Sequence, residues 1–137
     1  MSYLVYTNVI SELRRRDPNA SVVRWKSARP PSSVYLSVLT LGELRKGIEG
    51  LAESDKKRTL LDWLEIDLPA YFAGRILPVD VAVSDRWGRL LAKVGRPIPA
   101  IDSLLAATAL QHGLTMVTRN LKDFVVPELL VLDPWAE

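Results

Sequence analysis

The sequence has no cysteine and only one histidine among its 137 residues. The lack of cysteine excludes disulfide bonds, thiolate-bound zinc, iron–sulfur clusters and a thiol nucleophile, and it makes a reducing cytoplasm the expected location. No apolar run approaches the roughly 18 residues that a membrane-spanning helix needs, so we expect no membrane insertion. The glycine-rich motifs that hold phosphates in dinucleotide-binding and P-loop proteins are missing as well.

The excess of positive over negative charge is small too. Eighteen Lys and Arg residues stand against sixteen Asp and Glu residues, a formal net charge of +2, which is far from that of a protein that coats nucleic acid. The densest basic clusters, Arg14–Arg16 and Lys56–Arg58, could equally be solvated helix faces. With 48% hydrophobic residues, the composition is that of a folded protein, and the length predicts one domain over residues 1–137.

Short apolar runs alternate with segments of helical periodicity. Strands are predicted at Tyr3–Tyr6, Val34–Val38, Ile76–Val79, Thr115–Thr118 and Leu129–Leu132. Apolar residues recur at helical spacing over residues 9–13, 41–51, 60–64, 87–94 and 100–112. Strands that alternate with helices require right-handed crossovers, so the sequence predicts a three-layer α/β/α fold with a mainly parallel central sheet.

Several residues mark the expected helix ends. Asn8, Ser54 or Asp55, and Asp80 are candidates for N-caps. Pro69 is expected to end the helix before it, and Gly113 suits the left-handed position after a helix.

Polar residues follow several of the predicted strands, and ligands of open parallel sheets bind at these strand ends. They are Tyr6–Asn8, Glu43, Asp102 and the segment Asn120–Asp123, which follows Thr118. Three carboxylates with no basic residue among them would repel one another unless a cation offsets their charge. Mg²⁺ or Mn²⁺ suits such hard oxygen ligands, and metal-assisted hydrolysis of a phosphodiester is the matching chemistry.

Each acid also has a purely structural explanation. Thr40 and Glu43 have the spacing of a capping box. Asp102 could simply be favoured by the positive end of its helix dipole. Asp123 could be a solvated loop acid or a cap.

Four segments resemble the PIN-domain toxins of the VapC type. They are Tyr6–Leu13, Thr40–Gly47, Pro99–Ala109 and Thr118–Phe124, in the family's order. The resemblance implies a PIN-like fold and a Mg²⁺- or Mn²⁺-dependent endoribonuclease that cleaves RNA, possibly tRNA. It also implies the toxin half of a bacterial toxin–antitoxin module, with a VapB-type antitoxin as partner and a homodimer as the usual assembly.

Carried over residue by residue, Glu43, Asp102 and Asp123 fall on the family's second, third and fourth acids, expected to bind metal and to be catalytic. Asn120 lies in the same motif and is an alternative to Asp123 as the closer ligand. Supporting polar roles are expected for Thr7, Asn8, Thr118 and Asn120.

The departure from the family is at residue 6, where the Asp-Thr-Asn pattern reads Tyr6-Thr7-Asn8. A phenol has a pKa of about 10, is neutral at pH 7 and is bulky enough to intrude on the metal position. We therefore expect a PIN fold that binds Mg²⁺ or Mn²⁺ weakly and cleaves RNA poorly. A PIN fold without catalysis, serving as antitoxin partner and co-repressor, is the alternative, and a phosphoacceptor receiver domain is a more distant one.

RNA contacts are predicted first for Arg86, Arg89 and Lys93, which share one helix face, and second for Arg14–Arg16. An apolar groove for an antitoxin segment is expected near Asn8–Leu13 and Thr40–Leu51.

Overall fold

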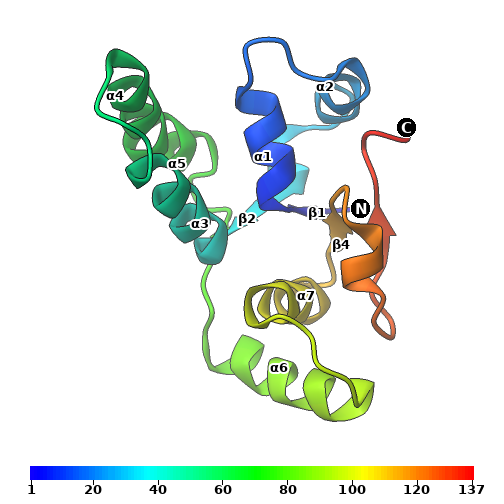
Figure 1. Ribbon diagram of the computed structural model, residues 1–137. Helices are drawn as coiled ribbons and strands as arrows, with labels where there is room; N and C mark the ends of the chain where they lie inside the picture. The colour runs from blue at the N-terminus through cyan, green and yellow to red at the C-terminus, as the bar shows by residue number, and fades with distance from the viewer.

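The computed structural model describes residues 1–137 and has a parallel sheet at its centre (Figure 1). The sheet has five strands in the order β3-β2-β1-β4-β5, and every neighbouring pair is parallel. This confirms the predicted fold class. The strands are shorter than predicted: β1 (Tyr3–Val5), β2 (Val34–Ser37), β3 (Ile76–Leu77), β4 (Thr115–Val117) and β5 (Val131–Leu132).

Helices cover both faces of the sheet. On one face lie α1 (Thr7–Arg14), α2 (Ala20–Ser27), α3 (Val38–Glu49), α4 (Asp55–Asp62) and α5 (Leu68–Tyr71), and on the other lie α6 (Val81–Val94) and α7 (Ala100–His112) (Figure 1). Single turns are η1 (Pro31–Ser33), η2 (Trp63–Asp67), which is a π-helix, and η3 (Leu121–Phe124). None of the helices combines the length and apolar character that a bilayer crossing requires.

The alternation of side chains along the strands builds two cores. In β1, Tyr3 and Val5 pack with the α1–α5 layer, whereas Leu4 packs with α6 and α7. In β4, Val117 and Met116 divide in the same way. Successive strand residues point to opposite faces, so a strand covered on both faces carries apolar side chains toward each of them.

The starts of α1 and α3 differ from the prediction. Tyr6 occupies the N-cap position of α1 without a side-chain cap, so the prediction of Asn8 as the cap is wrong. The helix begins directly after β1, and the Asn8 amide is drawn instead toward Thr118. In α3 the cap is Ser37, whose hydroxyl accepts the Leu39 N–H at 3.0 Å, and Thr40 is buried inside the helix. The capping-box explanation of Glu43 is therefore wrong.

Helix α2 was not predicted. The Asn19 side chain accepts the backbone N–H groups of Ser21 and Val22 at 2.9 and 3.3 Å and begins the helix. Only Val22 and Trp25 are buried in its two turns, which is too short an apolar pattern to stand out in the sequence. Its start is tied to α1, because the Asn19 N–H donates to the buried Glu12 carboxylate at 2.8 Å; this bond, aided by Arg15, lowers the pKa of Glu12.

The chain does not leave the helical path at Pro69, contrary to prediction. Helix α4 runs through the π turn η2 into α5, and the Leu68 N–H donates to the Trp63 carbonyl. Pro69 lies in the first turn of α5, where a missing N–H is tolerated. The caps at Ser54 and Asp80 and the left-handed Gly113, with φ 66°, are confirmed.

Candidate functional site

Tyr6 lies where β1 ends and α1 begins, at the carboxyl edge of the sheet. Its backbone N–H donates to the Val117 carbonyl at 2.9 Å, which ties it to the end of β4. Its hydroxyl donates to Asp102 Oδ1 at 2.8 Å, and its ring packs edge-on against Phe124 with centroids 5.3 Å apart. Tyr6 thus joins three segments that are distant in the sequence.

Carboxylates surround the Tyr6 phenol. Burial raises the pKa of Tyr6, and the hydrogen bond to Asp102 and the negative charges of Asp102, Glu43 and Asp123 raise it further. A phenolate in this position would face three like charges in a partly desolvated site. The phenol therefore stays protonated and acts as a hydrogen-bond donor.

Glu43 comes from α3 and is held by α1. Thr7 Oγ1 donates to Glu43 Oε1 at 2.5 Å. The half-buried Glu43 faces the start of α1 because Ser37 begins α3 directly after β2, so that residue 43 falls in the second turn. The sheet edge thus brings Thr7, Glu43, Tyr6 and Asp102 together, as the sequence predicted for polar residues at strand ends.

Thr118 links two polar residues of the site, Asn8 and Asn120. Its buried hydroxyl accepts the Asn120 N–H at 3.0 Å and the Asn8 side-chain amide at 3.4 Å. The Asn8 Oδ1 atom is buried and has no partner. Asp123 is exposed in η3, one residue before the buried Phe124, and reaches Tyr6 through its charge rather than through a contact.

The residues present do not fit a divalent ion as they are arranged. No three of the chain's Asp, Glu or His side chains converge closely enough to share one metal ion. Hydrogen bonds from Tyr6 and Thr7 already occupy one oxygen of Asp102 and one of Glu43. A neutral phenol lies among the acids, where the family resemblance predicts a carboxylate ligand.

The cations of α6 lie in a different hollow. Arg86, Arg89 and Lys93 line a pocket of about 360 Å³ together with Glu128, and none of its lining residues is an acid of the site. Arg86 and Lys93 pair with Glu128 at 3.6 and 3.5 Å, and Arg89 pairs with Asp85 at 3.0 Å. If these cations bind RNA as predicted, the phosphates have to displace the carboxylates of Glu128 and Asp85.

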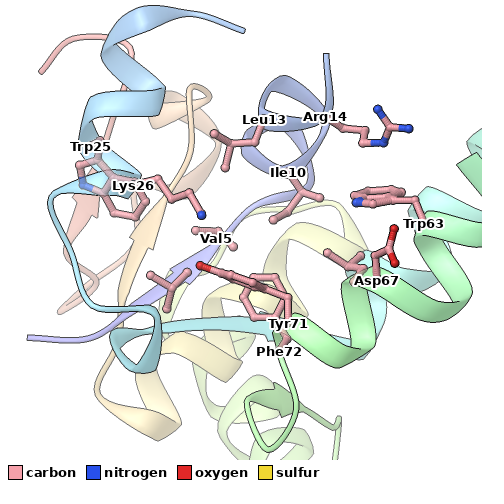
Figure 2. A pocket seen from close by; sticks show the side chains of 12 residues that line it. Val5, Ile10, Leu13, Arg14, Trp25, Lys26, Trp63, Asp67, Tyr71 and Phe72 are labelled. Carbon is pink, nitrogen blue, oxygen red and sulfur yellow. The ribbon is translucent and has the colours of Figure 1, made fainter. Parts of the chain in front are cut away.

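Two hollows flank α1. A groove of about 990 Å³ between α1, α3 and α4, here called the basic groove, includes Thr7, Glu43, Arg14–Arg16 and Lys56. An apolar pocket of about 280 Å³ lies between α1, α2 and α5, and its polar members are Arg14, Lys26 and Asp67 (Figure 2). Arg14 and Trp63 line both hollows, with the guanidinium 5.7 Å from the indole centroid.

Residues 3–125 match the family model described as PIN domain. The chain belongs to the PIN-domain family. The matched residues include Glu43, Asp102 and Asp123, so these acids lie within the PIN domain itself.

Named relatives cover nearly the whole of this PIN domain. Toxin FitB of Neisseria gonorrhoeae is 42% identical over 98% of this chain and 99% of its own length. VapC ribonuclease Y4jK of Sinorhizobium fredii is 34% identical over 94% of each chain. The similarity to these toxins and ribonucleases thus extends beyond the four segments that resemble VapC-type PIN domains.

Solved structures share the fold. The crystal structure of FitAcB from Neisseria gonorrhoeae aligns with a TM-score of 0.90 and 40% identity, covering 98% of this chain and 99% of that chain. A toxin–antitoxin complex from Klebsiella pneumoniae aligns with a TM-score of 0.71 and 27% identity, covering 97% and 98%. These agreements confirm a PIN-like arrangement of the sheet and helices.

The lining of the basic groove was not predicted from the sequence. A solvated helix face was one of two explanations for the cluster that contains Lys56, and Trp63 was not proposed as a functional residue, yet both line the same groove as Glu43. Their sequence signals, a tryptophan and a basic run, were visible. The placement of α4 beside α1 was not, because it depends on contacts between distant segments.

Proposed function

We propose that this chain is a toxin-type PIN domain whose RNA-cleaving site is blocked by Tyr6. The observation that carries the proposal is the Tyr6 hydroxyl donating to Asp102 at 2.8 Å amid the charges of Glu43 and Asp123. Relatives named as a toxin and as a VapC ribonuclease support the RNA-cleaving ancestry.

The block has a chemical cause. Metal-assisted hydrolysis by this family's acids needs carboxylate oxygens that are free to bind Mg²⁺ or Mn²⁺. Here the Tyr6 phenol is neutral, as a phenol is at pH 7, its pKa is raised further by burial and the nearby carboxylates, and its hydrogen bond engages Asp102. Replacing Tyr6 by aspartate would remove the phenol and supply the missing carboxylate.

The decisive experiment compares the chain with Tyr6→Asp on total tRNA, with Mn²⁺ and with chelator. We expect cleavage only by Tyr6→Asp and only with Mn²⁺, and we expect the added change Asp102→Asn to abolish it. Equal cleavage by the unchanged chain would refute the block. If neither protein cuts, the non-catalytic interaction module becomes the better interpretation.

We further propose an antitoxin as protein partner. The toxin–antitoxin complex among the solved neighbours supports it, and the apolar pocket beside α1 offers Leu13, Trp25 and Phe72 to apolar side chains of a partner segment (Figure 2). Binding there needs none of the acids, so a blocked catalytic site leaves it intact.

The partner can be tested with the product of a small reading frame adjacent to the gene. Leu13→Asp should weaken its binding at least about tenfold, because it places a charge in an apolar contact. Leu51→Asp, at a residue 41% exposed and outside the pocket, is the matched control. Equal binding by both variants would place the partner elsewhere, and light scattering on the same samples tests the expected homodimer.

A further inference from the structure

The basic groove contains part of the acidic site and four cations. Thr7 and Glu43 line it together with Arg14, Arg15, Arg16 and Lys56, whereas Asp17 and Glu43 are its only acids. A polyanion that reaches Glu43 along this groove would pass four positive side chains. The groove therefore has a net positive charge, opposite to that of the acidic site that it reaches at Glu43.

The cations of the groove are largely free of carboxylate partners. Arg15 pairs with Glu12 at 3.2 Å, but Arg14, Arg16 and Lys56 form no ion pair. Arg16 and Lys56 are exposed. Unpaired cations bind phosphates without first breaking an ion pair, which distinguishes this groove from the α6 pocket, where Glu128 and Asp85 already hold all three cations.

An aromatic surface accompanies these charges. The Arg14 guanidinium lies over the half-buried Trp63 ring (Figure 2). Both residues separate the basic groove from the apolar pocket and line each of them. Proteins that bind single-stranded nucleic acid combine cations, which contact the phosphate backbone, with an aromatic face on which a base can stack.

We propose that the basic groove binds single-stranded RNA, with Arg14, Arg16 and Lys56 on its phosphates and Trp63 stacking a base. Glu43 marks the point where the strand reaches the acidic site. The inference rests on the proposed ribonuclease ancestry and deepens it by naming the substrate path. It assigns RNA contacts to the C-terminal end of α1, to the residues that follow it, and to α4 and η2, in place of the α6 face.

The test measures binding without cleavage. A fluorescent RNA single strand of about 12 nucleotides is titrated in chelator with the unchanged chain and with Arg16→Glu/Lys56→Glu. We expect the double variant to bind at least about tenfold more weakly and the slope of log K against log salt to fall by about 1.4, or about 0.7 per lost phosphate contact. Two variants with the same change in net charge serve as controls: Arg24→Glu/Arg58→Glu, on α2 and α4 outside the groove, and Arg86→Glu/Arg89→Glu on α6.

The outcomes separate the alternatives. Weakening by the α6 variant alone would overturn the proposal in favour of that face, and equal weakening by all three variants would reduce it to a net-charge effect. Unchanged binding by Arg16→Glu/Lys56→Glu would overturn it and leave an acidic protein segment as occupant. Because no metal is present, these results do not depend on whether Tyr6→Asp cleaves tRNA, so the two proposals fail separately.

A second variant tests stacking. Trp63→Leu keeps an apolar side chain in the helix but removes the aromatic face, and we expect about fivefold weaker RNA binding with an unchanged salt slope. A circular dichroism spectrum and melting curve confirm that the variant is folded. Undiminished affinity in the folded variant would remove Trp63 from the RNA site.

Discussion

At the scale of single residues, Tyr6 converts a repulsive acidic cluster into a hydrogen-bonded contact. The phenol donates to Asp102 while its ring packs on Phe124, so one side chain removes a negative charge and adds apolar packing. A side chain at the edge of the sheet thereby contributes to stability where a family member would place a metal ligand.

This trade predicts a loss of stability in Tyr6→Asp when chelator is present. A fourth carboxylate beside Asp102, Glu43 and Asp123, together with the lost ring, should cost about 1–3 kcal/mol. Melting curves of both proteins in chelator measure the effect. Tyr6→Phe is the control that keeps the ring, and it should lie between the two. A Tyr6→Asp protein that melts at or above the temperature of the unchanged chain contradicts this account.

The titration of Tyr6 gives a second prediction. Burial and the neighbouring carboxylates raise its pKa above the ordinary value of about 10. A raised folded pKa means that the neutral phenol contributes its full stability below the unfolded pKa, and that this contribution is lost as the pH rises through the folded pKa. Stability relative to Tyr6→Phe should therefore be constant through neutral pH and decline only above about pH 10.

Phenolate absorbance checks the same point. The difference between the chain and Tyr6→Phe should show no ionisation step near pH 10 while the protein is folded. A step at the ordinary tyrosine pKa in the folded protein would mean that the phenol is solvated and does not donate to Asp102.

At the scale of elements, helix ends are set by buried side chains as much as by local capping. Lys57 is 5% exposed. Its ammonium donates to the carbonyls of Glu49 and Leu51 at 3.2 and 3.0 Å and to the Glu53 carboxylate at 2.8 Å. Lys57, in the first turn of α4, therefore caps the C-terminal end of α3, the helix that carries Glu43.

Lys57→Met should destabilise the protein by about 1–3 kcal/mol, because it keeps the length of the side chain but leaves the Glu49 and Leu51 carbonyls without the donor that they share. Urea unfolding measures the loss. The neighbouring exposed Lys56→Met should change stability by less than about 0.5 kcal/mol. Equal values for the two variants would mean that water replaces the ammonium without cost.

Some helix ends follow from local sequence, whereas others depend on how the elements pack. Asp80 and Gly113 mark helix ends through local chemistry, so both could be read from the sequence. The continuation past Pro69 could not, because the π turn before it depends on how that helix packs. The unpartnered Asn8 Oδ1 and the Asn8–Thr118 contact likewise arise only when β4 lies beside β1.

At the scale of the whole molecule, the acidic site exists because β1, β2 and β4 end at one edge of the sheet, where α7 begins. The change in melting temperature on adding Mn²⁺ should therefore depend on which side chain stands at residue 6. Mn²⁺ should leave the melting temperature of the unchanged chain where it is and raise that of Tyr6→Asp by several degrees, since a ligand stabilises only the folded state that binds it.

The control for this measurement is Tyr6→Asp/Asp102→Asn, which should lose the response to Mn²⁺. A comparable rise in the unchanged chain would show that Glu43, Asp102 and Asp123 bind metal despite the phenol. The assignment of Tyr6 as a block would then be wrong, whereas the PIN fold would stand.

The sequence by itself determined the fold class, the family and the residues at the strand ends. Periodicity and local order carry that information, because strands followed by helices leave few ways to form a parallel sheet. Only the tertiary structure decided that Tyr6 donates to Asp102, that Glu128 pairs with the α6 cations, and that Arg14, Arg16 and Lys56 share a groove with Glu43. Each of these depends on segments far apart in the chain, whose distances are set by the packing of the two cores and by no local pattern.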